Sequence, residues 1–149
     1  MPHSAAAASA QVHLAAAGGH LGALNYLLER GAFPSQQDLT AAGDTAAHHA
    51  ARRSHVAVLT LLARRGAALD TPNFQASQYA RGDWVSGGRA LGQLHQTPLH
   101  VAAEAGDAGT AAHLLRLGCD ANAVDFDGRT PLHYAIGALL RRETLKQKT

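Results

Sequence analysis

The chain has 149 residues, of which 46% are apolar but only 5% aromatic, and many of the apolar residues are alanine. Its formal net charge is +2. The last nine residues hold four basic and one acidic side chain, whereas the other 140 residues hold nine basic and ten acidic side chains. The basic isoelectric point near 9.0 therefore comes from a short tail, which argues against nucleic-acid binding by the body of the chain.

The sequence also argues against secretion and membrane insertion. Cys119 is the sole cysteine, so no disulfide can form within the chain, as is typical of a reducing compartment. No stretch approaches 18 consecutive apolar residues, so we expect no membrane span. No basic residue precedes Arg30, which argues against a secretory n-region and an arginine-rich transit peptide. We expect a cytoplasmic or nuclear protein.

The main sequence feature is an internal repeat. The heptapeptide TPLHVAA at residues 97–103 returns as TPLHYAI at residues 130–136, an offset of 33 residues. An alanine lies two residues after each of four histidines, and the first three of these histidines are followed by a leucine after fourteen residues and a glycine after eighteen. These four anchors are His13, His48, His100 and His133. Repetition at this interval is typical of an array of small stacked units.

In chain order, we predict that each unit is a helix–turn–helix hairpin followed by a loop. An alanine run, residues 5–8, begins the first helix of unit one, and leucines at helical spacing, such as Leu24 and Leu28, mark its second helix. The fourth unit is incomplete, and one helix is expected to run toward Leu145. The predicted units are residues 5–36, 43–75, 95–127 and 128–146 within a single domain, 1–149.

The residues of one unit explain its predicted turns. A threonine before each first helix, as at Thr97, is a good N-cap, and the following proline suits the first helical turn. A glycine six residues after the histidine can adopt a positive φ and end the helix. Unit two carries Ser54 at this position, and a non-glycine residue in that conformation costs about 1 kcal/mol or more. We therefore expect unit two to be the least stable.

Two departures from the regular spacing stand out. His48 and His100 are 52 residues apart, which predicts an inserted loop of 19 residues at 76–94, with Trp84 inside it. In the last unit, the apolar residues of the running helix are expected to cover the end of the array. These residues are Leu139, Leu140 and Leu145.

The repeat resembles the ankyrin repeat, whose period and T-P-L-H-x-A signature match units three and four. The resemblance covers roughly residues 10–138 and implies an all-α solenoid of stacked helix–turn–helix units with β-turn fingers. It also implies that the motif histidine bonds to the motif threonine and to a neighbouring loop. This role carries over to the pairs Thr45–His48, Thr97–His100 and Thr130–His133. Unit one has no such threonine, so the partner of His13 is open.

The sequence holds no pattern typical of a metal or catalytic site. A zinc site needs about four converging ligands, and the histidines outside the repeat positions share no ligand spacing. Neither HExxH, paired CxxC nor Gly-x-Ser-x-Gly occurs, and Cys119 falls where the ankyrin family has a small packed residue. We therefore expect no metal, no cofactor and no enzymatic activity.

By resemblance, the stack binds another protein along its concave face, and the chain itself is expected to be a monomer. The candidate contact residues are Arg52, Arg53, Trp84, Glu104, Phe126, Asp127 and Arg129. Phe126 is either an interface anchor at the tip of a loop or a side chain folded back on its own turn. Trp84 either anchors a partner or, the interpretation favoured here, pins the inserted loop onto the stack.

Two alternative functions belong to other classes. The incomplete last unit is compatible with a targeting or regulatory segment of a larger enzyme, such as a ligase, a kinase or an acyltransferase. The basic tail could instead bind nucleic acid or an acidic membrane, which predicts strong salt dependence.

Overall fold

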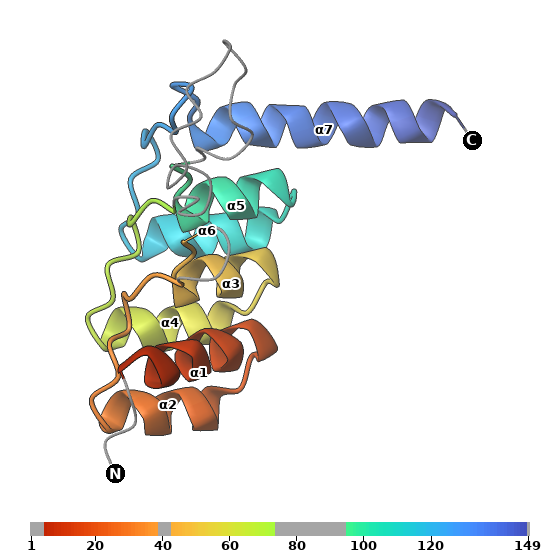
Figure 1. Ribbon diagram of the computed structural model, residues 1–149. Helices are drawn as coiled ribbons and strands as arrows, with labels where there is room; N and C mark the ends of the chain where they lie inside the picture. The colour runs from red at the N-terminus through yellow and green to blue at the C-terminus, as the bar shows by residue number, and fades with distance from the viewer. Residues whose placement is uncertain (1–4, 39–42, 74–94, 149) are drawn as a thin grey trace, which may run out of the picture.

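The computed structural model describes residues 5–38, 43–73 and 95–148. Within these ranges the structure is all-α, with no strand and one isolated β-bridge between Gln37 and Thr45 (Figure 1). The described helices are α1 (Ala5–Gly18), α2 (Leu21–Glu29), α3 (Ala46–Arg52), α4 (Val56–Arg64), α5 (Pro98–Glu104), α6 (Ala108–Arg116) and α7 (Pro131–Gln147).

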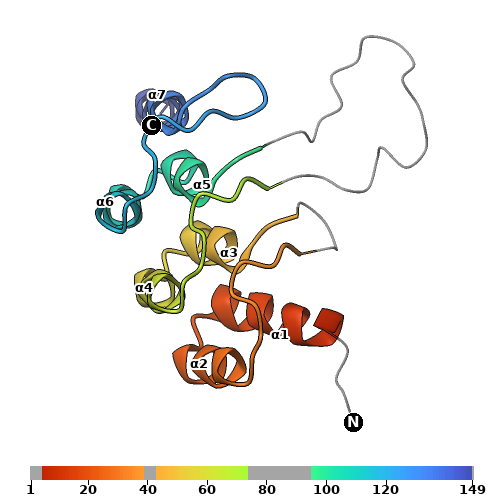
Figure 2. The same cartoon turned by 90° about the vertical axis from the view of Figure 1, so that its left-hand side faces the viewer.

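The helices form two parallel rows. Viewed along the helix axes, the inner row is α1, α3, α5 and α7, and the outer row is α2, α4 and α6 (Figure 2). Each of α1, α3 and α5 packs on the outer helix that follows it, and successive inner helices pack on each other. The predicted solenoid of stacked helix–turn–helix units is confirmed.

Small inner residues and larger outer residues build the core. Alanines of the inner row, such as Ala50 and Ala102, have no exposed surface. They let neighbouring inner helices approach closely, while Leu59, Leu62 and Leu114 of the outer row fill the space between the rows. The burial of these leucines supplies the largest share of the packing energy, because hydrophobic stabilisation scales with the apolar area removed from water.

Three segments connect an outer helix to the next inner helix, and we call them fingers: residues 30–45, 65–97 and 117–130. A backbone bond closes the base of each finger, from the N–H of Asp38 to the carbonyl of Asp44 (2.7 Å), from Asn73 to Gln96 (2.8 Å), and from Asp125 to Arg129 (2.9 Å). The second finger therefore leaves and re-enters the stack at one point, whatever its length. The predicted inserted loop, residues 76–94, and its Trp84 lie outside the described residues.

The last helix, α7, is a single helix of 17 residues and runs beyond the ends of the other helices (Figure 1). Its Pro131 and Ala138 are buried. The three leucines expected to cover the end of the array are instead exposed, so that expectation was wrong. The reason is that α7 continues straight, where a turn after Ala138 would have folded a second helix over its apolar side.

Ser54 occupies the turn where the other complete units have glycine. Its φ is +62°, close to the +71° and +72° of Gly19 and Gly106, so it carries the predicted backbone strain. Its hydroxyl donates a hydrogen bond to the side chain of Asp107, which caps the start of α6 in the next unit. The serine thus exchanges local strain for a contact between units two and three.

Substitutions at Ser54 should separate these two effects. Ser54→Ala keeps the strain and loses the hydrogen bond, so we expect the free energy of unfolding to fall by about 1 kcal/mol. Ser54→Gly loses the same bond but relieves about 1 kcal/mol of strain, so its stability should stay close to wild type. Urea denaturation followed by circular dichroism measures both. An alanine variant as stable as wild type would show that the contact with Asp107 contributes nothing.

Candidate functional site

The histidines of units two and three join their own helix to the following finger. The backbone N–H of Thr45 donates to Nδ1 of His48 (3.0 Å), and the threonine hydroxyl lies 2.9 Å from the same nitrogen. On the other side of the ring, Nε2 of His48 lies 2.7 Å from the carbonyl oxygen of Gln96. Since a carbonyl only accepts, the neutral ring carries its proton on Nε2.

The same arrangement recurs one unit later. Nδ1 of His100 lies 3.1 Å from the backbone nitrogen of Thr97 and 2.9 Å from its hydroxyl. Nε2 of His100 lies 2.9 Å from the carbonyl oxygen of Arg129. Each ring therefore bonds a carbonyl at the base of the next finger and fixes the position of that finger relative to its own inner helix.

The first and last units differ from this pattern. His133 is exposed, and its Nδ1 receives the backbone N–H of Thr130 at 3.0 Å. His13 has no motif threonine, and its Nδ1 lies 2.6 Å from the carbonyl oxygen of Ser9 while Nε2 lies 2.8 Å from that of Gln36. Both ring nitrogens of His13 face acceptors, so only the doubly protonated ring can donate to both.

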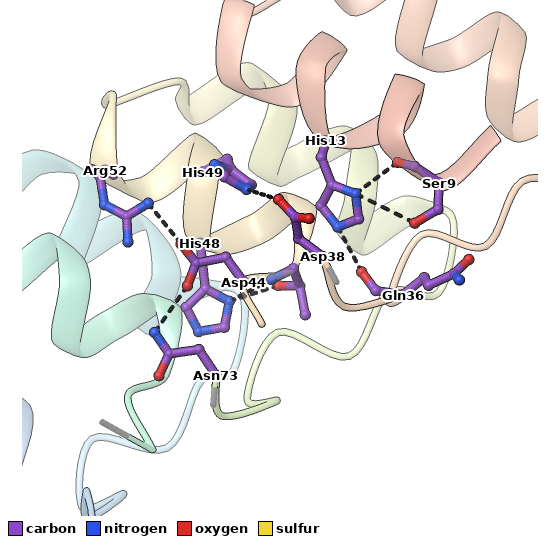
Figure 3. A network of polar contacts seen from close by, with 10 residues as sticks. Ser9, His13, Gln36, Asp38, Asp44, His48, His49, Arg52 and Asn73 are labelled. Atoms are coloured by element: carbon purple, nitrogen blue, oxygen red, sulfur yellow. Dashed lines mark hydrogen bonds and ion pairs between the residues drawn. The ribbon is translucent and has the colours of Figure 1, made fainter. Parts of the chain in front are cut away.

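A buried polar network lies at the bases of the first two fingers (Figure 3). One carboxylate oxygen of Asp44 receives the side-chain amide of Asn73 (2.9 Å), and the other receives the guanidinium of Arg52 (2.8 Å). Asn73 in turn accepts the backbone N–H of Gln96 (2.8 Å). The carboxylate thus ties the first finger to the second, on which the insertion begins and ends.

Burial and charge set the protonation of this network. Burial raises the pKa of Asp44, but hydrogen bonds from Asn73 and Arg52 outweigh it, so the pKa lies below its ordinary value. Burial lowers the pKa of His48 to about 4. Burial also lowers the pKa of His49, whose Nε2 lies 3.6 Å from the carboxylate of Asp38. At neutral pH, His48 is therefore neutral beside an ionised Asp44.

The third finger is held from below and carries exposed residues at its tip. The carboxylate of Asp125 accepts the backbone N–H groups of Asp127 (2.9 Å) and Arg129 (2.8 Å) and the hydroxyl of Tyr134. Phe126 is 63% exposed, so it is not folded back on its turn, and its ring stacks on the ring of His95 with centroids 6.4 Å apart. The side chains of Asp127 and Arg129 are exposed as well.

The other candidate residues come from different elements. Arg52 and Arg53 lie at the C-terminal end of α3 and Glu104 at that of α5, and all three are exposed. Arg52 is already committed to its ion pair with Asp44, so Arg53 is the more available of the two cations. Trp84 falls outside the described residues, and neither role predicted for it is tested.

The arrangement suits binding better than catalysis. Burial raises the pKa of the Cys119 thiol to about 11, so the sulfur is a poor nucleophile at neutral pH. Among the described residues, no group of three or more histidine, cysteine or acidic side chains is placed to hold a metal ion. No helix in the same part of the chain is long and apolar enough to cross a membrane.

Sequence reasoning missed the acidic and amide residues at the base of each finger. Asp38, Asn73 and Asp125 occupy equivalent places, and each begins the backbone bond that closes its finger. The Asp-Phe-Asp-Gly-Arg run before Thr130 was a usable signal for Asp125, because aspartate side chains commonly bond the backbone two residues on. The insertions hid the equivalence of Asp38 and Asn73.

His48 should make the stability of the chain depend on pH. Below its ordinary pKa of 6.5 the unfolded chain takes up a proton on His48, whereas the folded chain resists protonation until about pH 4. Stability is therefore lost as the pH falls through this window, by about 3 kcal/mol for this residue. His48→Gln, which can still accept the Thr45 N–H, should lose about 3 kcal/mol less than wild type between pH 7 and pH 4 in urea titrations.

His95→Gln is the matched control, because the ring of His95 is exposed. It should follow the wild-type pH dependence. If His48→Gln also follows the wild type, His48 does not titrate as its burial requires.

Comparison with known proteins gives a consistent result. Two family models, both described as ankyrin repeats (many copies), match residues 12–63 and residues 88–135. NF-kappa-B inhibitor alpha of Gallus gallus is 55% identical over 42 residues, which are 28% of this chain and 13% of that protein. Rabankyrin-5 of Homo sapiens is 51% identical over 43 residues, 29% of this chain and 4% of that protein.

Neurogenic locus notch homolog protein 1 of Xenopus tropicalis is 38% identical over 81 residues, which are 49% of this chain and 3% of that protein. The chain thus spans only a small part of each of these relatives. The repeated motif, the two rows of helices, the histidine links to the fingers and both family matches agree. The chain belongs to the ankyrin repeat family, whose repeats are protein–protein interaction units.

Proposed function

We propose that this chain is a non-catalytic module that binds another protein through its finger tips and the exposed ends of its inner helices. The observation that supports this most directly is the exposed ring of Phe126, on a finger whose backbone is held by three bonds to Asp125. In this proposal residues 1–149 act as one monomeric domain in the cytoplasm or the nucleus.

The physical advantage of such a site is its low ordering cost. A finger already fixed by Asp125 and by the bond between His100 and the Arg129 carbonyl loses little conformational freedom when it binds. Aromatic and arginine side chains also dominate the energy of protein interfaces, and Phe126 and Arg129 lie three residues apart on this finger. The name of one relative, NF-kappa-B inhibitor alpha, agrees with a protein as the class of partner.

The charges of the proposed surface are mixed. Arg53 and Glu104 project from the ends of neighbouring inner helices, and Asp127 and Arg129 share the third finger. Such a surface selects a partner by the pattern of its charges and by an apolar anchor, not by a single large field.

Removing the anchor should remove the partner. In affinity purification from cell extract followed by quantitative mass spectrometry, Phe126→Ala and Arg129→Ala should each lower recovery of specific partners at least tenfold, because hot-spot side chains contribute about 2 kcal/mol or more. Tyr26→Ala is the matched control, since Tyr26 is an exposed aromatic residue on the outer helix α2.

All three variants change exposed side chains, so their thermal unfolding should match the wild type. Unchanged recovery with both finger variants would show that the third finger is not the binding surface. A loss with Tyr26→Ala alone would move the surface to the outer row.

A further inference from the structure

The far end of the stack carries a second apolar surface, away from the finger tips. Helix α7 is the only inner helix of the described chain that has no outer helix packed beside it. A groove of about 170 Å³ lies where α7 meets α5 and α6. Its lining is mainly apolar, with Ala108 and Ala111 on α6 and Ala135, Ala138 and Leu139 on α7.

The repeat itself shows that this surface is built to be covered. Leu132 of α7 is 66% exposed, whereas the equivalent residues of units one to three, Val12, Ala47 and Leu99, are at most 3% exposed. Ile136 is 48% exposed, whereas its equivalents, Ala16, Ala51 and Ala103, are at most 7% exposed. In those units the inner helix is followed by an outer helix, and α7 keeps large apolar residues at the same positions without one.

Arg142 replaces one part of the missing structure. In the first turn, the ring of His55, which precedes α4, packs against Gly19 so closely that a Cβ there would lie 2.9 Å from it. At the third turn the guanidinium of Arg142 covers Gly106 in the same way, and it donates to the Gly106 carbonyl at 3.3 Å. The turn between α5 and α6 is thus closed, while Leu132, Ile136, Leu139 and Leu140 beyond it stay exposed.

The geometry of the outer row defines the helix that fits. Each of α2, α4 and α6 has nine residues and runs antiparallel to its inner helix, so a fourth such helix would begin near Arg141 and Arg142. Acidic residues in its first turn would meet these cations and also suit the positive end of the helix dipole. Leucines one turn apart on its other side would fill the groove.

We propose that this end surface, formed by the groove and the row Leu132, Ile136, Leu139 and Leu140, binds an amphipathic helix of a partner protein. The bound helix has about three turns, an apolar side and an acidic first turn, and it takes the place of a fourth outer helix. This surface and the finger tips are separate, so one partner segment can occupy it while another contacts the fingers.

A synthetic peptide taken from the chain itself tests the proposal. The probe is a fluorescein-labelled, C-terminally amidated peptide with the sequence of residues 105–117, which contains α6 and its acidic N-cap Asp107. Its fluorescence anisotropy should saturate with the full chain, and Ile136→Asp or Leu139→Asp should raise the Kd at least tenfold. A peptide with aspartate in place of the residue corresponding to Leu114 should not bind.

Leu145→Asp is the matched control on the chain. Leu145 is as exposed as Leu132, but it lies nine residues from Ile136, which is two and a half turns and hence the opposite side of α7. This variant should bind the peptide like wild type. All three substitutions are at exposed positions, and equal thermal unfolding verifies that each variant is folded.

Absence of saturable peptide binding overturns the proposal, and so does an equal effect of Leu145→Asp. Sedimentation equilibrium decides against a different occupant. If the wild type dimerises and Ile136→Asp makes it monomeric, the surface is covered by a second copy and not by a partner helix. Phe126→Ala should leave peptide binding unchanged, so failure here is distinguishable from failure of the proposed finger surface.

Discussion

A neutral histidine ring, bonded on one side to its own threonine and on the other to a carbonyl of the next finger, is the constraint on which the rest of the structure depends. His48 and His100 each make this link with both ring nitrogens. The bonds are short-range and directional, so they position one unit on the next in a way that alanine packing alone cannot. The link requires the ring to stay neutral, and burial in the stack ensures this for His48.

The two sides of the stack are joined by different contacts. At the finger side, Asp44, Asn73 and Gln96 form a buried network that holds successive fingers together. On the outer row, neighbouring helices meet through more exposed polar pairs, such as Thr60 with His113. Since buried polar networks lose more when one member is removed than exposed pairs do, the finger side should be the more rigid one. Rigid finger bases with exposed tips are what a pre-organised binding surface requires.

The two ends of the inner row are also unlike each other. At the start, His13 bonds two carbonyls in place of a threonine, within a helix that begins with alanines. At the far end, α7 retains the motif Thr130–His133 but continues straight for 17 residues instead of turning back. The motif therefore specifies how a helix starts, whereas the residues after it decide whether a hairpin follows. In unit four no glycine stands where Gly19 and Gly106 end their helices, and Leu139 continues the helix.

The sequence by itself determined the fold class, the order of the helices and the turn residues, because a repeat with fixed spacing encodes local structure that each unit reads in the same way. It also indicated that Phe126 lies on a finger, although only its exposure in the folded chain shows that it does not fold back on the turn. Tertiary structure alone decided that Asp44 and Asn73 meet across 29 residues and that Ser54 reaches Asp107. It likewise decided that the leucines of α7 stay exposed, because these outcomes depend on which surfaces come together in space, and spacing along the chain does not record that.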